Sequence, residues 1–138
     1  MNDLDKAKKK VLQEAKSIAI VGVSADDTKS SYEVAYYMRE FGYTVYPINP
    51  KLTEWRGKPA YADLLSLPGP VDVVNIFRPS DQVLPFVEQA IQIGAKCVWL
   101  PLGIVNEEAA KKARAAGLTV FMDSCMMIEY GRLIGQRR

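Results

Sequence analysis

Few residues of this chain could perform chemistry, and one chemically versatile type is missing altogether. The sequence contains two cysteines, Cys97 and Cys125, and no histidine. Without histidine, the chain has no Ser–His or Cys–His nucleophile pair, no imidazole for acid–base catalysis and no histidine metal ligand. It also lacks a Cys-x-x-Cys pair that could hold zinc, and its composition does not favour a disulfide framework. We therefore expect no metal site.

Three carboxylates remain as candidates for acid–base catalysis, and each has a structural explanation. Asp72 is flanked by apolar residues in a predicted strand, so we expect it to support the fold. We expect Asp123 to cap the start of a helix, and Glu129 to pair with Arg132 three residues further on. The sequence therefore predicts no catalytic residue.

The residues best suited to hold a ligand are a strand, a glycine and a polar loop that leads into a helix. Residues 17–31 read Ser-Ile-Ala-Ile-Val-Gly-Val-Ser-Ala-Asp-Asp-Thr-Lys-Ser-Ser. The apolar, β-branched start is typical of a buried parallel strand, and Gly22 allows a sharp turn and close approach to a ligand. Ser30 or Ser31 is expected to cap the helix, with Glu33 completing a capping box. The free N–H groups at the start of that helix favour a phosphate.

The details of this pattern bear on which nucleotide it would bind. Ser24 stands where a dinucleotide fingerprint has its second glycine, and the second predicted strand ends in Asn49-Pro50-Lys51 rather than in an acid. Both features argue against NAD as the ligand, whereas a cation such as Lys51 suits the extra ribose phosphate of coenzyme A or NADP. There is no Walker loop for ATP. Phe77 and Arg78 could cover an adenine or pair with a phosphate, although both lysine and arginine could also simply be solvated.

Predicted strands and helices alternate along the whole chain. Strands are expected over residues 17–23, 43–48, 71–77, 96–100 and 118–122, and helices over 3–15, 31–41, 61–65, 81–93, 106–116 and 124–133. This alternation predicts an α/β fold, a Rossmann-like doubly wound parallel sheet of about five strands with helices on both faces. The strand before Gly22 is expected at its centre, and ligands should bind at the carboxyl ends of the strands.

Length and composition are those of an ordinary globular chain. The chain has 138 residues, a net charge of +2, 49% hydrophobic residues and 25% charged residues. We predict a single domain over 1–138, with an N-terminal helix in 1–15, a Rossmann-like core in 16–133 and frayed residues at 136–138. Nothing indicates nucleic-acid binding, a membrane span or a signal peptide, so a cytoplasmic location is expected.

Five segments, in this order, resemble the small, stand-alone CoA-binding proteins. They are Val21-Gly22-Val23-Ser24, Tyr46-Pro47-Ile48-Asn49-Pro50-Lys51, Val71-Asp72-Val73-Val74-Asn75-Ile76-Phe77-Arg78, Gly94-Ala95-Lys96-Cys97-Val98-Trp99-Leu100 and Met122-Asp123-Ser124-Cys125-x-x-x-Glu129. This family shares its Rossmann-like fold with the CoA-binding domain of the succinyl-CoA synthetase alpha subunit. The chain departs from the family pattern at Pro101, Ser124 and Tyr130, where relatives commonly have Gln, Arg and His.

The resemblance implies a coenzyme A or acyl-CoA ligand and assigns residues to it. The diphosphate would be held by Gly22, Val23, Ser24, Lys29, Ser30 and Ser31. The adenosine and its 3′-phosphate would lie by Asn49, Pro50 and Lys51. The adenine or the start of the pantetheine arm would be flanked by Ile76, Phe77 and Arg78. The arm would continue past Leu102 and Gly103 towards Ser124 and Cys125.

The function expected from these observations is the binding of CoA or acyl-CoA without intrinsic catalysis, as a carrier or redox-linked module. One alternative is the CoA-binding subunit of an acyl-CoA ligase or transferase that needs a partner chain, and another is an NAD(P)-binding protein. In the synthetase, a histidine of another domain carries the phosphoryl group, and this chain has no histidine. Cys125 is predicted to start the last helix, where it either forms a mixed disulfide with CoA or stays inert.

Overall fold

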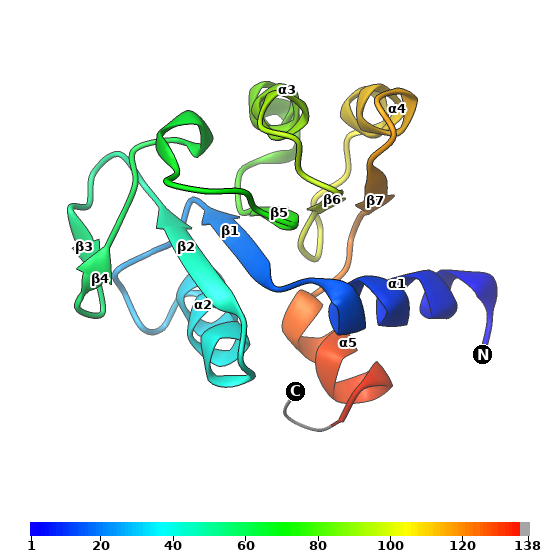
Figure 1. Cartoon of the computed structure of the whole chain (residues 1–138), viewed down its shortest axis with the longest axis horizontal. Coiled ribbons are helices and arrows are strands. Elements are labelled where there is room, and N and C mark those ends of the chain that lie inside the picture. Colours follow the sequence, from blue (N-terminus) through cyan, green and yellow to red (C-terminus); the bar gives the residue numbers. More distant parts are fainter. Residues whose placement is uncertain (136–138) are drawn as a thin grey trace.

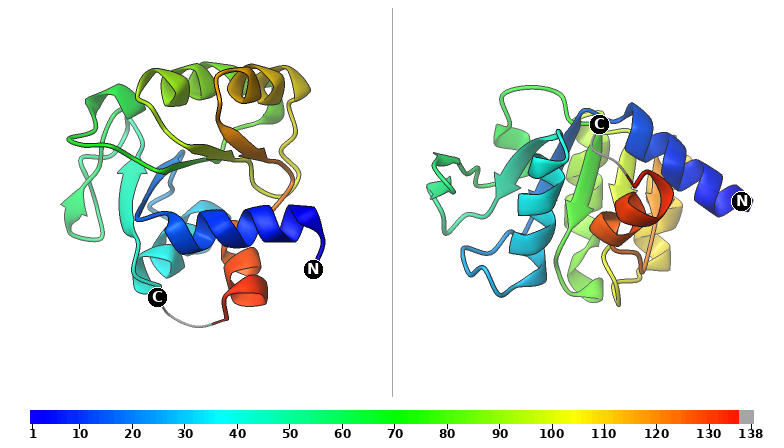
Figure 2. Two further views of the ribbon diagram at one scale, coloured as in Figure 1. Left: turned by 45° about the vertical axis from the view of Figure 1, so that its right-hand side comes forward. Right: turned by 90° about the horizontal axis from the view of Figure 1, so that it is seen from below.

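The computed structural model describes residues 1–135 and contains a five-stranded parallel sheet between two layers of helices (Figure 1). The strands, in spatial order, are β2 (Thr44–Ile48), β1 (Ser17–Val21), β5 (Val73–Ile76), β6 (Cys97–Trp99) and β7 (Thr119–Phe121). The helices α3 (Leu84–Gln92) and α4 (Glu107–Ala115) cover one face, and α1 (Asp3–Glu14), α2 (Ser30–Glu40) and α5 (Met126–Leu133) cover the other (Figure 2). The predicted fold class is confirmed. The prediction for residues 136–138 lies outside the described residues.

Burial explains why β1 reads as an unbroken apolar run. Ala19 and Val21 pack into the core beneath α3 and α4, whereas Ile18 and Ile20 pack into the core on the side of α1, α2 and α5. All five residues of β1 are buried. A parallel strand with helices on both sides has no solvent face, so β1 is apolar apart from Ser17 at its start, whose hydroxyl accepts a hydrogen bond from the N–H of Asp72.

The place of β1 differs by one strand from the prediction. β1 pairs in parallel with β2 on one side and with β5 on the other, so it is interior, but β5 is the central strand. The reason is that the chain runs outward once, from β1 to β2, and then adds three strands on the opposite side. The change of direction between β1 and β5 creates a switch point at the carboxyl edge of the sheet.

The connection between β2 and β5 contains structure that the sequence pattern did not predict. A short antiparallel hairpin is formed by β3 (Glu54–Trp55) and β4 (Lys58–Pro59), and its turn has positive φ angles at Arg56 (49°) and Gly57 (79°). The helix predicted over 61–65 is replaced by a 3-10 turn, η1 (Leu64–Ser66). A second 3-10 turn, η2 (Ser80–Gln82), precedes α3. No helix within residues 1–135 combines the length and apolar character that crossing a membrane requires.

Candidate functional site

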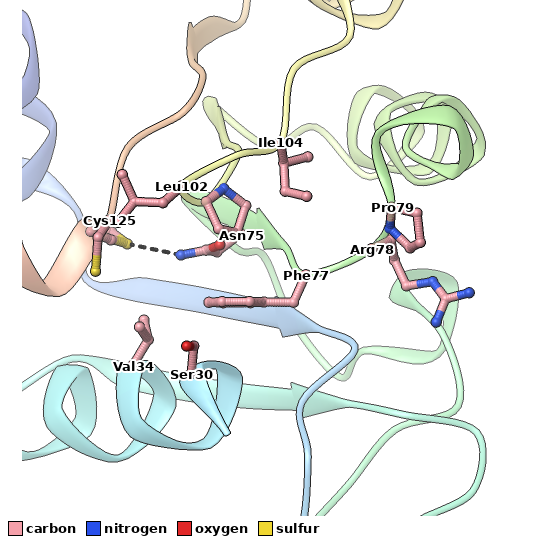
Figure 3. Close-up of a pocket in the computed structure, with 11 residues that line it drawn as sticks. Ser30, Val34, Asn75, Phe77, Arg78, Pro79, Leu102, Ile104 and Cys125 are labelled. Carbon is pink, nitrogen blue, oxygen red and sulfur yellow. Dashed lines mark hydrogen bonds between the residues drawn. The ribbon is translucent and has the colours of Figure 1, made fainter. Parts of the chain in front are cut away.

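A cavity of about 290 Å³ lies at the carboxyl edge of the sheet, beside the switch point between β1 and β5. Open α/β sheets bind their ligands at such points. Four segments form the walls: the start of α2, the end of β5, the loop after β6 and the start of α5 (Figure 3). The lining residues are Ser30, Val34, Asn75, Phe77, Arg78, Pro79, Pro101, Leu102, Ile104, Cys125 and Met126.

Gly22, the first residue after β1, brings the following loop against the end of β5. Its φ angle is +81°, and a Cβ atom at this position would overlap the carbonyl oxygen of Phe77. Only glycine meets both conditions without strain. Gly22 was predicted to allow close approach to a ligand, and in the structure it lies in close contact with the protein's own backbone at Phe77. This contact sets the path of residues 22–29.

Side-chain hydrogen bonds fix the loop that follows Gly22. The N–H of Ser24 donates to the Ser31 hydroxyl at 3.0 Å, and the N–H of Asp26 donates to the Ser24 hydroxyl at 2.9 Å. The N–H and the hydroxyl of Thr28 both donate to the Asp26 carboxylate. The two hydrogen bonds from Thr28 stabilise the ionised carboxylate and lower the pKa of Asp26 below its usual value.

The start of α2 lacks the capping box that the sequence predicted. Ser30 is already the first helical residue, and the residue before it, Lys29, makes no side-chain capping bond. The Ser31 hydroxyl is engaged by Ser24 instead, and Glu33 is exposed. The capping prediction is wrong because the residue in the N-cap position is Lys29, so the helix already includes both serines. An uncapped helix start leaves N–H groups available to an anion.

The segment after β2 supports this loop from the other side. The Asn49 side-chain amide donates to the carbonyl of Val23 at 2.8 Å, and its oxygen accepts from the N–H of Lys51 at 2.9 Å. The indole N–H of Trp55, on the unpredicted hairpin, donates to the carbonyl of Ser24 at 2.9 Å. Asn49 therefore positions the loop with both ends of its amide, whereas Lys51 is exposed to solvent.

The end of β5 supplies an aromatic wall and a cation. Phe77 is half-buried and lines the cavity, and Arg78 is exposed with its guanidinium 2.5 Å from the Gln82 side-chain oxygen. Ile76, predicted to flank the ligand, is fully buried in the core beneath α3 and α4. The Ser80 hydroxyl, two residues after Arg78, accepts a hydrogen bond from the N–H of Val105 in the loop after β6.

The loop after β6 closes the opposite side of the cavity. Asp123 does not cap α5 as predicted but accepts a hydrogen bond from the N–H of Gly103 at 2.7 Å. Asp123 has a φ angle of +52°, a conformation that aspartate tolerates better than most residues. This bond ties the segment before α5 to the loop that carries Leu102, whose side chain is 60% exposed at the cavity.

Among the residues that line this cavity, Asn75 is the polar one that the sequence analysis missed. It is 1% exposed, and its side-chain N–H₂ lies 3.7 Å from the sulfur of Met126 (Figure 3). Its side-chain oxygen is buried without a hydrogen-bond partner in the described chain. Buried polar atoms are nearly always paired, so an unpaired one in a cavity wall indicates a place for a ligand's donor. The available signal was an amide within the otherwise apolar run of β5.

The predicted residues fall into three groups in the structure. Lining the cavity are Ser30, Phe77, Arg78, Leu102 and Cys125. Shaping the adjoining loop or buried beneath it are Gly22, Val23, Ser24, Ser31, Asn49, Ile76 and Ser124. Exposed at the same edge are Lys29, Pro50, Lys51 and Gly103. The five residues of the cavity-lining group and Asn75 thus surround the same cavity.

The acidic residues are occupied elsewhere. Glu129 pairs with Arg132 at 2.5 Å, as predicted, and Arg132 also pairs with Asp5 on α1. Asp72 lies at the amino edge of the sheet, where it accepts hydrogen bonds from the N–H groups of Lys16 and Ser17. In residues 1–135, no group of three or more histidine, cysteine or acidic side chains could hold a metal ion.

Comparisons with known proteins give a family match and similar structures. A family described as "CoA binding domain" matches residues 16–131. The uncharacterized protein YneT of Bacillus subtilis is 37% identical over 122 residues, which cover 88% of this chain and 90% of YneT. A hypothetical protein from Pyrococcus horikoshii OT3 has a similar structure, with a TM-score of 0.92, 40% identity, and coverage of 95% of this chain and 92% of that one.

A second group of relatives is much longer. The alpha subunit of acetate–CoA ligase (ADP-forming) II of Pyrococcus furiosus is 38% identical over 85 residues, which are 60% of this chain and 18% of the subunit. The chain therefore spans only about a fifth of that ligase subunit.

Proposed function

This chain belongs to the CoA binding domain family, and from that premise we propose that it binds coenzyme A, free or acylated, across the carboxyl edge of its sheet. The observation that carries the proposal is the cavity at the switch point, between the uncapped start of α2 and the end of β5. The chain would act as a binding or carrier module and catalyse no reaction of its own.

The size and lining of the cavity suit the pantetheine arm rather than the whole ligand. Its volume of about 290 Å³ is at the lower limit for small-molecule sites. Val34, Phe77, Ile104 and Met126 make most of its wall apolar, and the unpaired Asn75 oxygen provides one acceptor. Pantetheine is a slender chain with secondary amide N–H groups, so it matches an apolar channel with a single buried acceptor.

The polar end of the ligand would lie outside this cavity. The first turn of α2, which lacks a side-chain cap, would offer its backbone N–H groups to the diphosphate. Lys29, Lys51 and Arg78 are exposed cations at the same edge of the sheet and would face the phosphates. Cations and helix N–H groups together favour a ligand with several phosphates over an uncharged one.

A ligase role is the second candidate, and the similarity to acetate–CoA ligases favours it. In this case the chain would bind CoA for a second subunit that carries the phosphoryl-transfer chemistry. Co-purification of a partner from the source cells, together with acyl-CoA formation by the pair only, would establish this role.

Calorimetric titration under reducing conditions tests the binding proposal. We expect CoA to bind one site per chain and NAD and NADP to bind far more weakly, because Ser24 replaces the second glycine of the dinucleotide fingerprint. Tighter binding of NADP than of CoA, or no heat with CoA and acetyl-CoA, would contradict the proposal. Release of free CoA from acetyl-CoA by the purified chain, lost in Asp123→Asn, would contradict the absence of catalysis.

A further inference from the structure

We propose that Cys125 is a site of thiol–disulfide exchange with oxidised CoA, so that this chain forms a mixed disulfide with CoA inside its own cavity. The inference rests on the proposed CoA binding and goes beyond it, since it assigns a covalent step and a redox condition to the site. Its consequence is a cavity that is closed to free CoA and acyl-CoA when the CoA pool is oxidised.

The position of Cys125 is the first support. Cys125 and Arg78 both line the cavity, and Figure 3 shows them at its opposite ends. A ligand that places its phosphates near Arg78 would therefore extend its arm, which ends in the thiol, towards Cys125. The cysteine is unpaired and half-buried, and it immediately precedes α5 without making a side-chain capping bond. A thiolate formed there would lie at the positive end of this helix.

The second support is independent of the cysteine. Asn75, another lining residue, lies between these two ends (Figure 3), and its side-chain oxygen is buried without a partner in the described chain. An acceptor of this kind is satisfied by an N–H donor that enters the cavity. An amide of the pantetheine arm is such a donor, and a hydrogen bond at this point would hold the arm in line with Cys125.

The opening beside Cys125 allows the second half of a disulfide to leave. Leu102 borders the cavity and is 60% exposed, so the wall at this residue faces solvent. Cys97 provides the contrast within the same chain. It is 1% exposed at the other edge of the sheet, and burial raises the pKa of its thiol far above the usual value. Only Cys125 combines access with a binding site.

The step balances without a further oxidant. The Cys125 thiolate attacks one sulfur of CoA disulfide, the sulfur–sulfur bond of the disulfide breaks, and a bond between Cys125 and that CoA forms. The other CoA leaves as a thiolate and takes up a proton from solvent. One disulfide is exchanged for another, and a small thiol reverses the reaction.

Intact-protein mass spectrometry of the reduced full-length chain tests the proposal. We expect one CoA to be added on incubation with CoA disulfide and to be removed by dithiothreitol. The reaction should be about tenfold or more faster than with glutathione disulfide at equal concentration, because binding pre-positions the reacting sulfur. Cys125→Ser should abolish the adduct, and the matched variant Cys97→Ala should retain it. Asn75→Leu should slow the reaction with CoA disulfide by about threefold to tenfold, but not the reaction with glutathione disulfide.

Several outcomes would overturn the proposal: no adduct, an adduct that persists in Cys125→Ser, or equal rates with the two disulfides. If Cys125→Ser does not fold, tryptic peptides of the wild-type adduct decide the site, because cleavage after Lys96 and Arg114 separates the two cysteines. Titration of wild-type protein with reduced CoA keeps the two proposals distinct. Binding of reduced CoA without an adduct would reject the exchange alone, whereas loss of both would reject the CoA site.

Discussion

The amino and carboxyl edges of the sheet each contain a cavity and a cysteine, and the amino-edge cavity is the larger, at about 430 Å³ against 290 Å³. It lies between α1 and the starts of β5, β6 and β7 and is lined by Asp72, Lys96 and Cys97, among others. Of these two cavities, volume would select the one at the amino edge as the binding site. The polar groups at the two edges indicate the opposite.

At the amino edge, the polar groups satisfy one another. The Asp72 carboxylate accepts from the N–H of Lys16 at 2.7 Å and of Ser17 at 3.2 Å, and it lies 3.6 Å from the Lys96 ammonium. The Ser17 hydroxyl in turn accepts from the N–H of Asp72 at 3.0 Å. Burial pushes the pKa of Asp72 upward, but the hydrogen bonds and the lysine outweigh it and lower the pKa below the usual value.

At the carboxyl edge, polar groups are left available. The Asn75 oxygen is buried without a partner in the described chain, and α2 begins without a side-chain cap. A free protein that keeps such groups unpaired loses stability that a ligand can restore. We therefore place the proposed ligand at the carboxyl edge because its hydrogen-bonding groups are unsatisfied, although its cavity is the smaller of the two.

The largest expected effect comes from a pair of glycine substitutions, one at each edge. Gly22→Ala should lower the free energy of unfolding by about 2–4 kcal/mol and abolish CoA binding, because the new Cβ overlaps the Phe77 carbonyl at φ +81°. Gly117→Ala, before β7, should cost only about 1–2 kcal/mol, since its φ is +91° but the space around it is open. Urea unfolding and CoA titration measure both variants. Equal losses of binding would remove the distinction between the edges.

The next effect should appear at the amino edge and leave binding intact. Asp72→Asn should lower the free energy of unfolding by about 1–3 kcal/mol at pH 7, because two backbone N–H groups lose a charged acceptor. CoA affinity should stay within twofold of the wild-type value, a margin of about 0.4 kcal/mol. A large loss of affinity would mean that the amino edge takes part in binding.

The same variant has a defined pH dependence. The folded-state pKa of Asp72 is lower than its unfolded value of 3.8, so its stabilisation is fully present above that value and is lost as the pH falls through the folded pKa. The difference in unfolding free energy between wild type and Asp72→Asn should therefore be constant at neutral pH and shrink below about pH 4. A difference that is unchanged at low pH would show that the carboxylate charge is irrelevant.

A substitution at the carboxyl edge should have the opposite effect, with stability kept and CoA affinity reduced. Asn75→Leu replaces a buried amide whose oxygen is unpaired by an apolar side chain of similar size, so the free protein should be as stable as the wild type or up to about 1 kcal/mol more stable. CoA affinity should fall by about threefold to tenfold, because the ligand loses one hydrogen bond. Loss of stability with unchanged affinity would assign Asn75 to the fold instead.

Most of the fold could be predicted from the sequence, because alternating apolar runs and helical periodicity are local signals. The strands at residues 17–21 and 73–76 illustrate this, as do the helices predicted to end before Gly42, Gly94 and Gly117, three glycines that have positive φ angles in the structure. The hairpin at residues 54–59 was not predicted because each of its strands has only two residues. The order of the strands in the sheet could not be predicted because it depends on contacts between residues that are distant in sequence.

The site was less predictable than the fold. The segments that lie at the carboxyl edge could be predicted, since parallel strands end at the same edge of a sheet. The hydrogen bonds made by each side chain could not be predicted. Ser31 and Asn49 were predicted to contact the ligand, and the structure adds a role that the sequence did not predict: they hold the loop through hydrogen bonds to Ser24 and Val23. Asn75 was missed because an amide in a strand looks structural until its lack of a partner is seen.

The smallest expected effect concerns two lysines, again one at each edge. Lys51 is exposed at the carboxyl edge, where we place the 3′-phosphate, and Lys96 is 81% exposed at the amino edge beside Asp72. CoA should bind more tightly than dephospho-CoA by about 1 kcal/mol, a modest value because solvent screens an exposed ion pair. Lys51→Met should remove this difference, and Lys96→Met should retain it. Raising the salt concentration should reduce the wild-type difference as well.

A preference for CoA that survives in Lys51→Met would place the 3′-phosphate elsewhere, next to Lys29 or Arg78. The same titration of Lys29→Met and Arg78→Met would then locate it.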